Sequence, residues 1–304
     1  MKLIKYIKNP KLILYFLDLY GLHILNDKDY LKCRYKLTFN KDLDLDNPKS
    51  FNEKLQWLKI NNRRSIYQTM VDKYYVKEYV ANIIGKEHII KTVGIYEKFN
   101  DINFDKLPNS FVIKCTHDSN STIVVRDKKN IDLKHIKKRI NKALKSNHYY
   151  LSREWPYKSL KPHIIIEEYM YNKNINEKLI DYKFFCFNGN PTFIYVSEGL
   201  ENHSTAKIDF FDINFKKASF RRSDFDSFDR SINKPKSFKR MIEIAKTLSK
   251  DIPFVRVDLY EIKNKVYFSE LTFFPGGGFI RFEPEEWDKK IGDMLDISMV
   301  KNEK

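Results

Sequence analysis

The chain has 304 residues, of which 42% are hydrophobic and 15% aromatic, so it can bury a sizeable core and is not intrinsically disordered. Lys and Arg number 56 against 40 Asp and Glu, and the formal charge of +16 favours anionic partners: nucleotides, nucleic acids, anionic polymers or a membrane surface. The three cysteines form no C-x-x-C pair, which argues against a disulfide framework or a zinc site and predicts a reducing, cytosolic compartment.

The N-terminal segment combines lysines with an apolar stretch. The residues from Leu12 to Leu25 are mostly apolar, and lysines stand before them at Lys2, Lys5, Lys8 and Lys11. The stretch is too short for a transmembrane helix, and no small-residue cleavage site follows it. It is compatible with an amphipathic helix docked on the core and with a basic helix lying on an anionic membrane surface. We expect a cytoplasmic protein, which under the second interpretation contacts the inner face of the membrane.

Two helices are predicted in the first third of the chain. Ser50 and Glu53 form a capping box, and Phe51, Leu55 and Leu58 give the helix that follows an apolar face. A second helix is predicted to start at Asp72 and to end at Gly85, which is followed by a short buried strand at residues 89–93.

The rest of the chain is rich in strands. Residues 111–114 and 122–125 predict a hairpin, residues 131–147 a helix, and Ile164–Ile166 a buried strand. Further strands are predicted at 181–187, 192–197 and 206–211, a helix at about 237–250, and a final hairpin from 255–259 and 266–271. This order predicts an α+β fold with antiparallel sheets.

The final hairpin brings two carboxylates together. With Lys263-Asn264-Lys265 as its loop, Asp258 lies opposite Glu270 and Arg256 lies opposite Thr272. Two carboxylates facing each other on one sheet face are destabilising without a counter-charge. A cation such as Mg²⁺ between them is one interpretation. An exposed polar face with Arg256 as the partner is the other.

The same hairpin resembles the end of an ATP-grasp domain. The resemblance lies in Val255-Arg256-Val257-Asp258, in Ser269-Glu270-Leu271-Thr272 and in Phe274-Pro275-Gly276-Gly277-Gly278. It implies that Asp258 and Glu270 bind Mg²⁺ and that Arg256 meets the reacting phosphate. The family commonly has Asn as a further metal ligand at the position of Thr272, whose hydroxyl is expected to contribute weakly.

Other segments resemble the nucleotide-binding parts of the same family. Lys114 and Lys73 resemble lysines that contact the phosphates, and Lys183 resembles a further one that acts beside Arg256 in catalysis. The loop 116–121 lacks the usual glycines, so we expect Ser119 and Ser121 to donate hydrogen bonds to phosphate. The adenine is expected at the strand and hinge formed by Glu167, Glu168, Tyr169 and Met170.

The segment Asn47–Leu55 and the Phe274–Gly277 end resemble the TupA-like branch of the ATP-grasp family, which is named for teichuronopeptide synthesis. The implied fold has two α+β subdomains that clamp ATP, behind an N-terminal helical region at residues 1–68. The ATP-grasp domain would span 69–304, with a nucleotide-clamping subdomain at about 105–170 and a metal-binding subdomain at about 171–290.

The implied function is ATP- and Mg²⁺-dependent joining of a carboxylate to an amine through an acyl phosphate. The expected partners are a carboxylate-bearing sugar or polysaccharide, such as a uronic-acid-containing surface polymer of a capsule, and an amine donor such as an amino acid. The alternative is a glycosyltransferase, because Asp42-Leu43-Asp44, Asp44-Leu45-Asp46 and Asp224-Phe225-Asp226 match a D-x-D pattern. A nucleic-acid binder is a third class, but no zinc, RRM or KH signature supports it, and we expect no nucleic acid.

Overall fold

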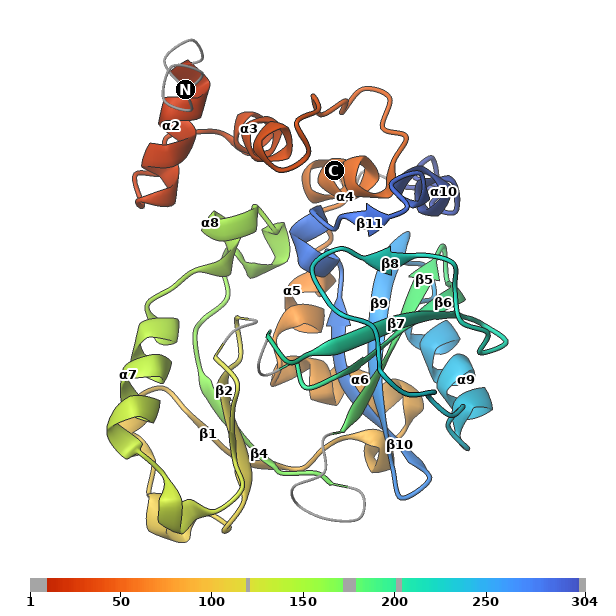
Figure 1. The fold of residues 1–304 in the computed structure, drawn as a ribbon. Helices are drawn as coiled ribbons and strands as arrows, with labels where there is room; N and C mark the ends of the chain where they lie inside the picture. The colour runs from red at the N-terminus through yellow and green to blue at the C-terminus, as the bar shows by residue number, and fades with distance from the viewer. Residues whose placement is uncertain (1–9, 119–120, 172–178, 201–203, 301–304) are drawn as a thin grey trace.

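The computed structural model describes residues 10–118, 121–171, 179–200 and 204–300. In these residues, N-terminal helices precede two antiparallel sheets that lie beside each other, with further helices against them (Figure 1). The predicted α+β class with antiparallel sheets is therefore confirmed. Ser119 and the lysines Lys2, Lys5 and Lys8 lie outside the described residues.

The N-terminal helices are α2 (Pro10–Leu19), α3 (Asp27–Phe39), α4 (Phe51–Asn61) and α5 (Ile66–Val71). The capping box of α4 is confirmed, because the Ser50 hydroxyl accepts from the Glu53 N–H at 3.2 Å and the Glu53 carboxylate accepts from the Ser50 N–H at 2.9 Å. The predicted apolar face of α4 is buried as well. Within the described chain, we find no helix with the length and apolar character needed to cross a bilayer.

These helices divide between two cores. The apolar residues of α2 and α3, such as Tyr15 and Leu31, form a separate small cluster. In contrast, α4 and α5 pack through Phe51 and Met70 into the main core beneath the larger sheet. The expected boundary near residue 68 falls inside α5.

The smaller sheet has the strand order β1-β4-β2-β3, from β1 (Thr92–Tyr96), β4 (Ile164–Glu168), β2 (Phe111–Cys115) and β3 (Ile123–Val125). The predicted hairpin is confirmed as β2 and β3, and the predicted buried strand as β4. The helix α7 (Leu133–Leu144) lies against this sheet through Ile136 and Ile140 (Figure 1).

The larger sheet has the order β10-β9-β5-β6-β7. Its strands are β5 (Ile180–Phe187), β6 (Asn190–Glu198), β7 (Lys207–Asp212), β9 (Phe254–Ile262) and β10 (Lys265–Thr272). The helix α9 (Phe238–Leu248) packs on β5, β6 and β9, where Met241 and Leu248 join a core rich in phenylalanine (Figure 1).

Shorter elements complete the described chain. The short strands β8 (Arg221–Arg222) and β11 (Phe282–Glu283) pair with each other. The helix α10 (Trp287–Asp293) follows β11 and packs on α4. In the chain, the helix α6 (Tyr75–Ile84) lies between α5 and β1, and the helix α8 (His148–Ser152) lies between α7 and β4. The 3-10 helices are η1 (Lys86–His88), η2 (Phe99–Asp101), η3 (Phe104–Lys106), η4 (Lys128–Asn130), η5 (Trp155–Tyr157) and η6 (Pro275–Gly278).

Two predicted elements begin later than expected. Asp72 does not start a helix but accepts the backbone N–H groups of Tyr74 and Tyr75 at 2.9 and 3.0 Å, and α6 begins there. The strand predicted at 89–93 forms at Thr92–Tyr96 instead, because Ile89 makes an isolated bridge to Phe268 of the larger sheet.

The final hairpin has the predicted facing pairs but a different loop. Lys263 and Asn264 alone form the turn, both with positive φ, and Lys265 already pairs with Ile262. A bulge between Phe268 and Glu270 then shifts the register by one residue. Beyond this bulge Glu270 pairs with Asp258 and Thr272 with Arg256, as the sequence predicted.

A buried lysine on α4 fixes the glycine turn that follows β10. The Lys59 ammonium donates to Gln56 Oε1 at 2.9 Å and to the carbonyls of Ser152 and Gly277 at 2.7 Å each. The Gln56 amide donates to the Gly278 carbonyl at 2.6 Å. Gly278 has a φ of +70°, and a Cβ there would overlap Gln56, so this position requires glycine.

Lys59 predicts a distinctive pH dependence of stability. Burial lowers its pKa to about 7, although the carboxylate of Glu154 opposes the shift. Above this pH the unfolded chain binds more protons than the native protein, up to the ordinary lysine pKa of 10.5, so the free energy of unfolding should rise with pH across this window. Lys59→Met should make this rise smaller than in the wild type, as measured by chemical denaturation; Lys73 and Lys77, whose pKa values burial also lowers, contribute the remainder.

The exposed Lys32→Met on α3 is the control, and it should leave the pH profile of the wild type unchanged. A rise in Lys59→Met as steep as that of the wild type would contradict the assignment.

Candidate functional site

A cavity of about 300 Å³ lies between the two sheets. The smaller sheet and its neighbours contribute Lys73, Lys77, Lys114, Glu167, Glu168, Tyr169 and Met170 to its wall. The larger sheet contributes Asp181, Lys183, Tyr260, Ser269 and Glu270. Most of the residues that the sequence selected therefore meet in one place, although they come from distant segments. Asp258, Arg256 and Thr272 lie directly behind this wall.

The larger sheet carries its charges in a row across three strands. Lys183 of β5 pairs with Asp258 of β9, which pairs with Glu270 of β10. The Lys183 ammonium lies 2.7 Å from Asp258 Oδ2. Arg256 binds both Asp258 oxygens, with Nε donating at 2.7 Å and Nη2 at 2.6 Å. The same Nη2 lies 3.1 Å from Glu270 Oε1 and 3.0 Å from the Thr272 hydroxyl.

The two facing carboxylates thus share protein cations. Asp258 has a fully buried side chain, whereas the side chain of Glu270 is 37% exposed and reaches the cavity. Burial acts to raise the pKa of Glu270, but the charges of Arg256, Lys183 and Lys73 lower it to about 2. Burial also acts to lower the pKa of Lys183, yet Asp181 and Asp258 raise it above its ordinary value. Burial raises the pKa of Asp258 above its ordinary value, although the charges of Arg256 and Lys183 oppose this shift.

The opposite wall has its own charged group, centred on Glu167. Its carboxylate lies 2.5 Å from the Lys114 ammonium and also pairs with Lys77, which donates further to the Ile90 carbonyl at 2.8 Å. Burial acts to raise the pKa of Glu167, but Lys114 and Lys77 lower it. One buried carboxylate therefore holds two ammonium groups at the cavity.

Lys73 lies in the cavity wall as well, and its charge interacts with Glu270 of the larger sheet. Its N–H donates to the Thr116 carbonyl at 3.0 Å, and its ammonium donates to the Asp118 carbonyl. Burial lowers the pKa of Lys73, while Glu270 and Asp118 act in the other direction. Ser121 is buried outside the cavity wall, where its hydroxyl donates to Asp118 at 2.6 Å and accepts from the Cys115 N–H at 2.7 Å. Ser121 therefore holds the loop, and Ser119 lies outside the described residues.

Part of the cavity wall is apolar, and it includes Ile90, Val112, Val124, Met170 and Phe268. Tyr169 is nearly buried, with the Arg126 guanidinium 5.7 Å from the centre of its ring. Glu168 is exposed and lines the wall beside them. The wall therefore offers both apolar and charged groups, as a ligand with a flat aromatic ring and a charged tail requires.

The oxygen donors of Asp258, Glu270 and Thr272 are of the type that Mg²⁺ prefers. In the described part of the chain, no group of at least three His, Cys, Asp or Glu side chains is placed to hold a metal. Glu270 reaches the cavity and fits an ion that takes one carboxylate and completes its octahedron with phosphate oxygens and water, as Mg²⁺ usually does, whereas Arg256 and Lys183 engage both oxygens of Asp258.

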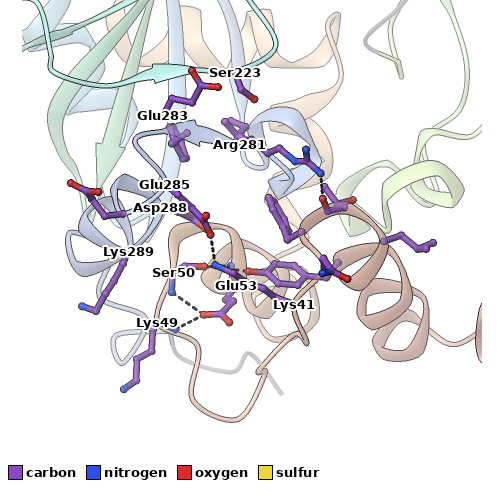
Figure 2. A pocket seen from close by; sticks show the side chains of 18 residues that line it. Lys41, Lys49, Ser50, Glu53, Ser223, Arg281, Glu283, Glu285, Asp288 and Lys289 are labelled. Atoms are coloured by element: carbon purple, nitrogen blue, oxygen red, sulfur yellow. Dashed lines mark hydrogen bonds and ion pairs between the residues drawn. The ribbon is translucent and has the colours of Figure 1, made fainter. Parts of the chain in front are cut away.

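A larger cavity, of about 860 Å³, lies between the end of α3, the start of α4 and residues 280–289 (Figure 2). Several of its charged groups already have ion-pair or hydrogen-bond partners. Lys41 pairs with Glu285, and Glu53 accepts the backbone N–H groups of Lys49 and Ser50. Most of the described residues that the sequence selected line the other cavity, and none lines this one.

The aspartates of the D-x-D patterns make local contacts. Asp44 accepts the backbone N–H groups of Asp46 and Asn47, and Asp224 binds the Arg222 guanidinium at 2.9 and 2.6 Å. Neither aspartate lines the cavity between the sheets.

Sequence reasoning missed Lys77, Asp181 and Arg126. Lys77 lies on α6 and meets Glu167 of β4 only in the folded protein, and no local pattern indicates this pair. Asp181 begins the strand that carries Lys183, and a polar pair at spacing two would have suggested that both share one face. No local signal distinguishes Arg126 from a solvated arginine.

Comparison with known proteins gives one family. The model of the family described as TupA-like ATPgrasp matches residues 53–296, which is more than half of the chain. No curated protein sequence matches.

Solved structures with a similar arrangement include the D-alanine–D-alanine ligases from Helicobacter pylori (15% identity, 75% of this chain and 61% of that chain, TM-score 0.37) and, complexed with ATP, from Bacillus anthracis (15%, 75%, 63%, 0.38). Another is the ATP-grasp ligase PsnB complexed with minimal precursor, Mg and ADP (10%, 82%, 66%, 0.42). The chain spans less than two thirds of the length of the two D-alanine–D-alanine ligases, and these likenesses concern the fold alone.

The Glu167 group predicts a large and pH-dependent effect on stability. Glu167→Gln leaves two buried ammonium groups without their counter-charge and should lower the free energy of unfolding by about 3–5 kcal/mol at pH 7. Because the pKa of Glu167 is lowered in the folded protein, its contribution is present above the unfolded pKa of about 4.3 and is lost as pH falls below it. The difference between wild type and variant, measured by denaturation, should therefore shrink in acid.

The adjacent Glu168→Gln is the matched control. Its side chain is exposed, so it should change stability by no more than about 0.5 kcal/mol. Equal effects of the two substitutions would contradict the role given to Glu167.

Proposed function

Because the chain belongs to the TupA-like ATP-grasp family, we propose that it is an ATP-dependent carboxylate–amine ligase that binds ATP between the two sheets of its ATP-grasp fold. The observation that carries the proposal is the set of lysines on facing walls of one cavity. Lys73, Lys77 and Lys114 stand on one side and Lys183 on the other, with the carboxylate of Glu270 among them. This arrangement suits a polyanion that must be held at a metal ion.

The nucleotide is oriented by the difference between the two ends of the cavity. The adenine ring packs among Ile90, Val112 and Phe268, and the backbone of Tyr169 and Met170 reads its edge. Since the carboxylate of Glu167 is engaged by two lysines, Glu168 is the acid that accepts the adenine amino group. Glu167 then serves to aim Lys77 and Lys114 at the phosphates.

The reaction takes place at the end of the cavity that borders the larger sheet. A substrate carboxylate oxygen attacks the γ-phosphorus of ATP, the bond to the β-phosphate oxygen breaks, and ADP leaves. The resulting acyl phosphate is attacked by an amine, which releases phosphate and a proton and leaves an amide. No protein nucleophile is needed, because the chain supplies fixed charges and orientation.

Arg256 and Lys183 supply the charges nearest to the transferred group. They already bind Asp258, so an arriving phosphate finds them desolvated and held in place. Mg²⁺, held by Asp258 and Glu270 with the Thr272 hydroxyl beside them, would neutralise charge on the phosphates.

The acceptor is a carboxylate-bearing sugar, such as a uronic acid in a surface polysaccharide or its precursor, and the amine comes from an amino acid. The family resemblance supports this choice, and the net charge of +16 fits an anionic acceptor. The protein acts in the cytoplasm. A contact with the inner face of the membrane is also expected from the sequence.

Within this proposal, the ATP-grasp domain covers 69–304, with the nucleotide clamp at about 105–170 and the metal-binding part at about 171–290. The N-terminal helical region, 1–68, supports the site through α4, whose Lys59 and Gln56 hold the glycine turn.

A screen of uronic acids crossed with amino acids, in the presence of ATP and Mg²⁺, tests the function directly. Phosphate release should require both substrates, and the product mass should equal the sum of the two minus water. Transfer of a sugar without ATP consumption would instead support the glycosyltransferase alternative.

The metal site gives the first activity prediction. Asp258→Asn and Glu270→Gln should each abolish Mg²⁺-dependent ATP turnover, because each removes a charged oxygen ligand. Circular dichroism and thermal melting test whether each variant folds, because Asp258→Asn also leaves Lys183 and Arg256 without their shared buried counter-charge, whereas Glu270 is partly exposed. ATP turnover at the wild-type rate in either variant would remove that residue from the site.

The nucleotide site gives the second. Lys114→Ala should weaken ATP binding by about 1.5–3 kcal/mol, which is about 10- to 150-fold in Kd, because a charge-assisted contact to phosphate is lost. Calorimetry measures the affinity directly. The control is Lys134→Ala on the exposed face of α7, which should bind ATP as the wild type does. Unchanged affinity in Lys114→Ala would exclude Lys114 from phosphate binding.

A further inference from the structure

Exposed apolar side chains gather on α2 and the turn that follows it. Tyr20 is 87% exposed, Leu22 59% and Ile24 53%, and Ile13 and Phe16 of the helix are exposed as well. Leu151 of the neighbouring α8 is also exposed. Several large apolar side chains exposed on one helix and the turn that follows it mark a candidate interaction site on a folded protein. Figure 1 shows α2 at the upper left edge of the molecule, beside α3 and α8 and far from the larger sheet.

The chain holds this surface in place. The inner side of α2 packs on α3 through Leu12 and Tyr15. The buried carboxylate of Asp18 accepts the backbone N–H groups of Ile24 and Leu25 and pairs with Arg153. The turn is therefore tied back onto the helix, and its apolar side chains project outward from a fixed backbone.

A basic cleft of about 610 Å³ adjoins the apolar surface. Lys28, Arg63, Arg153 and Lys158 line it together with Tyr149 and Tyr150. The acid in the cleft, Asp27, is already engaged by Arg63 at 2.6 Å and by the Tyr149 hydroxyl at 2.6 Å. Among the described residues, Lys28 and Lys158 have no carboxylate partner, and Nε of the buried Arg153 has no hydrogen-bond partner.

We propose that this face docks on an anionic lipid bilayer. The apolar side chains of residues 13–24 enter the interface between headgroups and acyl chains, and a headgroup phosphate enters the cleft between Lys28 and Lys158. Apolar groups flanked by cations are the composition of surfaces that lie in the plane of a membrane. Tyr20 adds an aromatic ring of the kind enriched at membrane interfaces.

The charge distribution favours a bilayer over a second copy of the chain. In a two-fold dimer the same surface faces itself, so the cleft cations of both copies would approach one another. An anionic bilayer surface instead carries charge opposite to that of these cations, so no like charges approach one another on binding. The proposal is also independent of nucleotide chemistry, because none of these residues lines the cavity between the sheets.

Vesicle sedimentation with the full chain tests the proposal. The protein should bind phosphatidylcholine vesicles that contain phosphatidylglycerol, bind pure phosphatidylcholine vesicles far more weakly, and lose binding as salt rises. Leu22→Asp combined with Ile24→Asp should reduce binding at least about tenfold, because two inserted side chains become charged. Lys28→Glu combined with Lys158→Glu should reduce it as strongly.

Lys134→Glu combined with Lys138→Glu on the exposed face of α7 makes the same change in net charge and is the matched control. It should retain most of the binding. All these side chains are exposed, so the folds should persist, and unchanged melting and ATP turnover establish this for each variant. Tyr20→Asp serves as a second apolar variant should the double variant melt early.

Three outcomes would overturn the proposal. They are absence of binding to anionic vesicles at low salt, an equal loss in the α7 control, and a dimer in sedimentation velocity that Leu22→Asp with Ile24→Asp dissociates. Each would leave the ligase proposal untouched, since ATP turnover is measured without lipid.

Discussion

The structure depends above all on the buried carboxylate of Asp258 and the two cations that bind it. Arg256 donates hydrogen bonds to both of its oxygens, and the Lys183 ammonium of β5 pairs with it. Glu270 lies opposite it on β10. Two facing carboxylates would repel each other, and the protein cations remove that cost before any ligand arrives. Of these two buried cations Lys183 lines the cavity, and Arg256 reaches Glu270, which lines it as well. A stable sheet and a site ready for phosphate are therefore two consequences of one charge arrangement.

The opposite wall of the cavity has the reverse arrangement, in which one buried acid lies between two lysines. There Glu167 is the buried acid that allows Lys77 and Lys114 to stand side by side, where two unneutralised ammonium groups would be costly. The sheets are thus complementary supports for a polyanion. The N-terminal helices take part in this support through Lys59, which reaches from α4 to the glycine turn after β10. They also carry, on their other side, the apolar and basic face of α2.

Much of this could be predicted from the sequence, because the strands follow local patterns, whereas the lysines and most of the acids were selected through the resemblance to the ATP-grasp family. The final hairpin shows the limit. Its facing pairs were predicted with a three-residue loop, whereas the chain uses a two-residue turn and restores the register with a bulge before Glu270. Lys77 and the buried role of Lys59 were missed, because a lysine on a helix carries no local sign of the carboxylate or carbonyls that it meets in the fold. Ser121 was selected for its hydroxyl, which the loop itself uses.

The most direct measurement of the central claim is a crystal structure of the full chain with Mg²⁺ and a non-hydrolysable ATP analogue. The account predicts the phosphates between Lys114 and Lys183, the metal at Asp258 and Glu270, and the adenine against Val112 and Phe268. A nucleotide bound elsewhere, such as in the larger cavity beside Lys41 and Glu285, with Asp258 still enclosed by Arg256 and Lys183 and no metal beside it, would contradict the account.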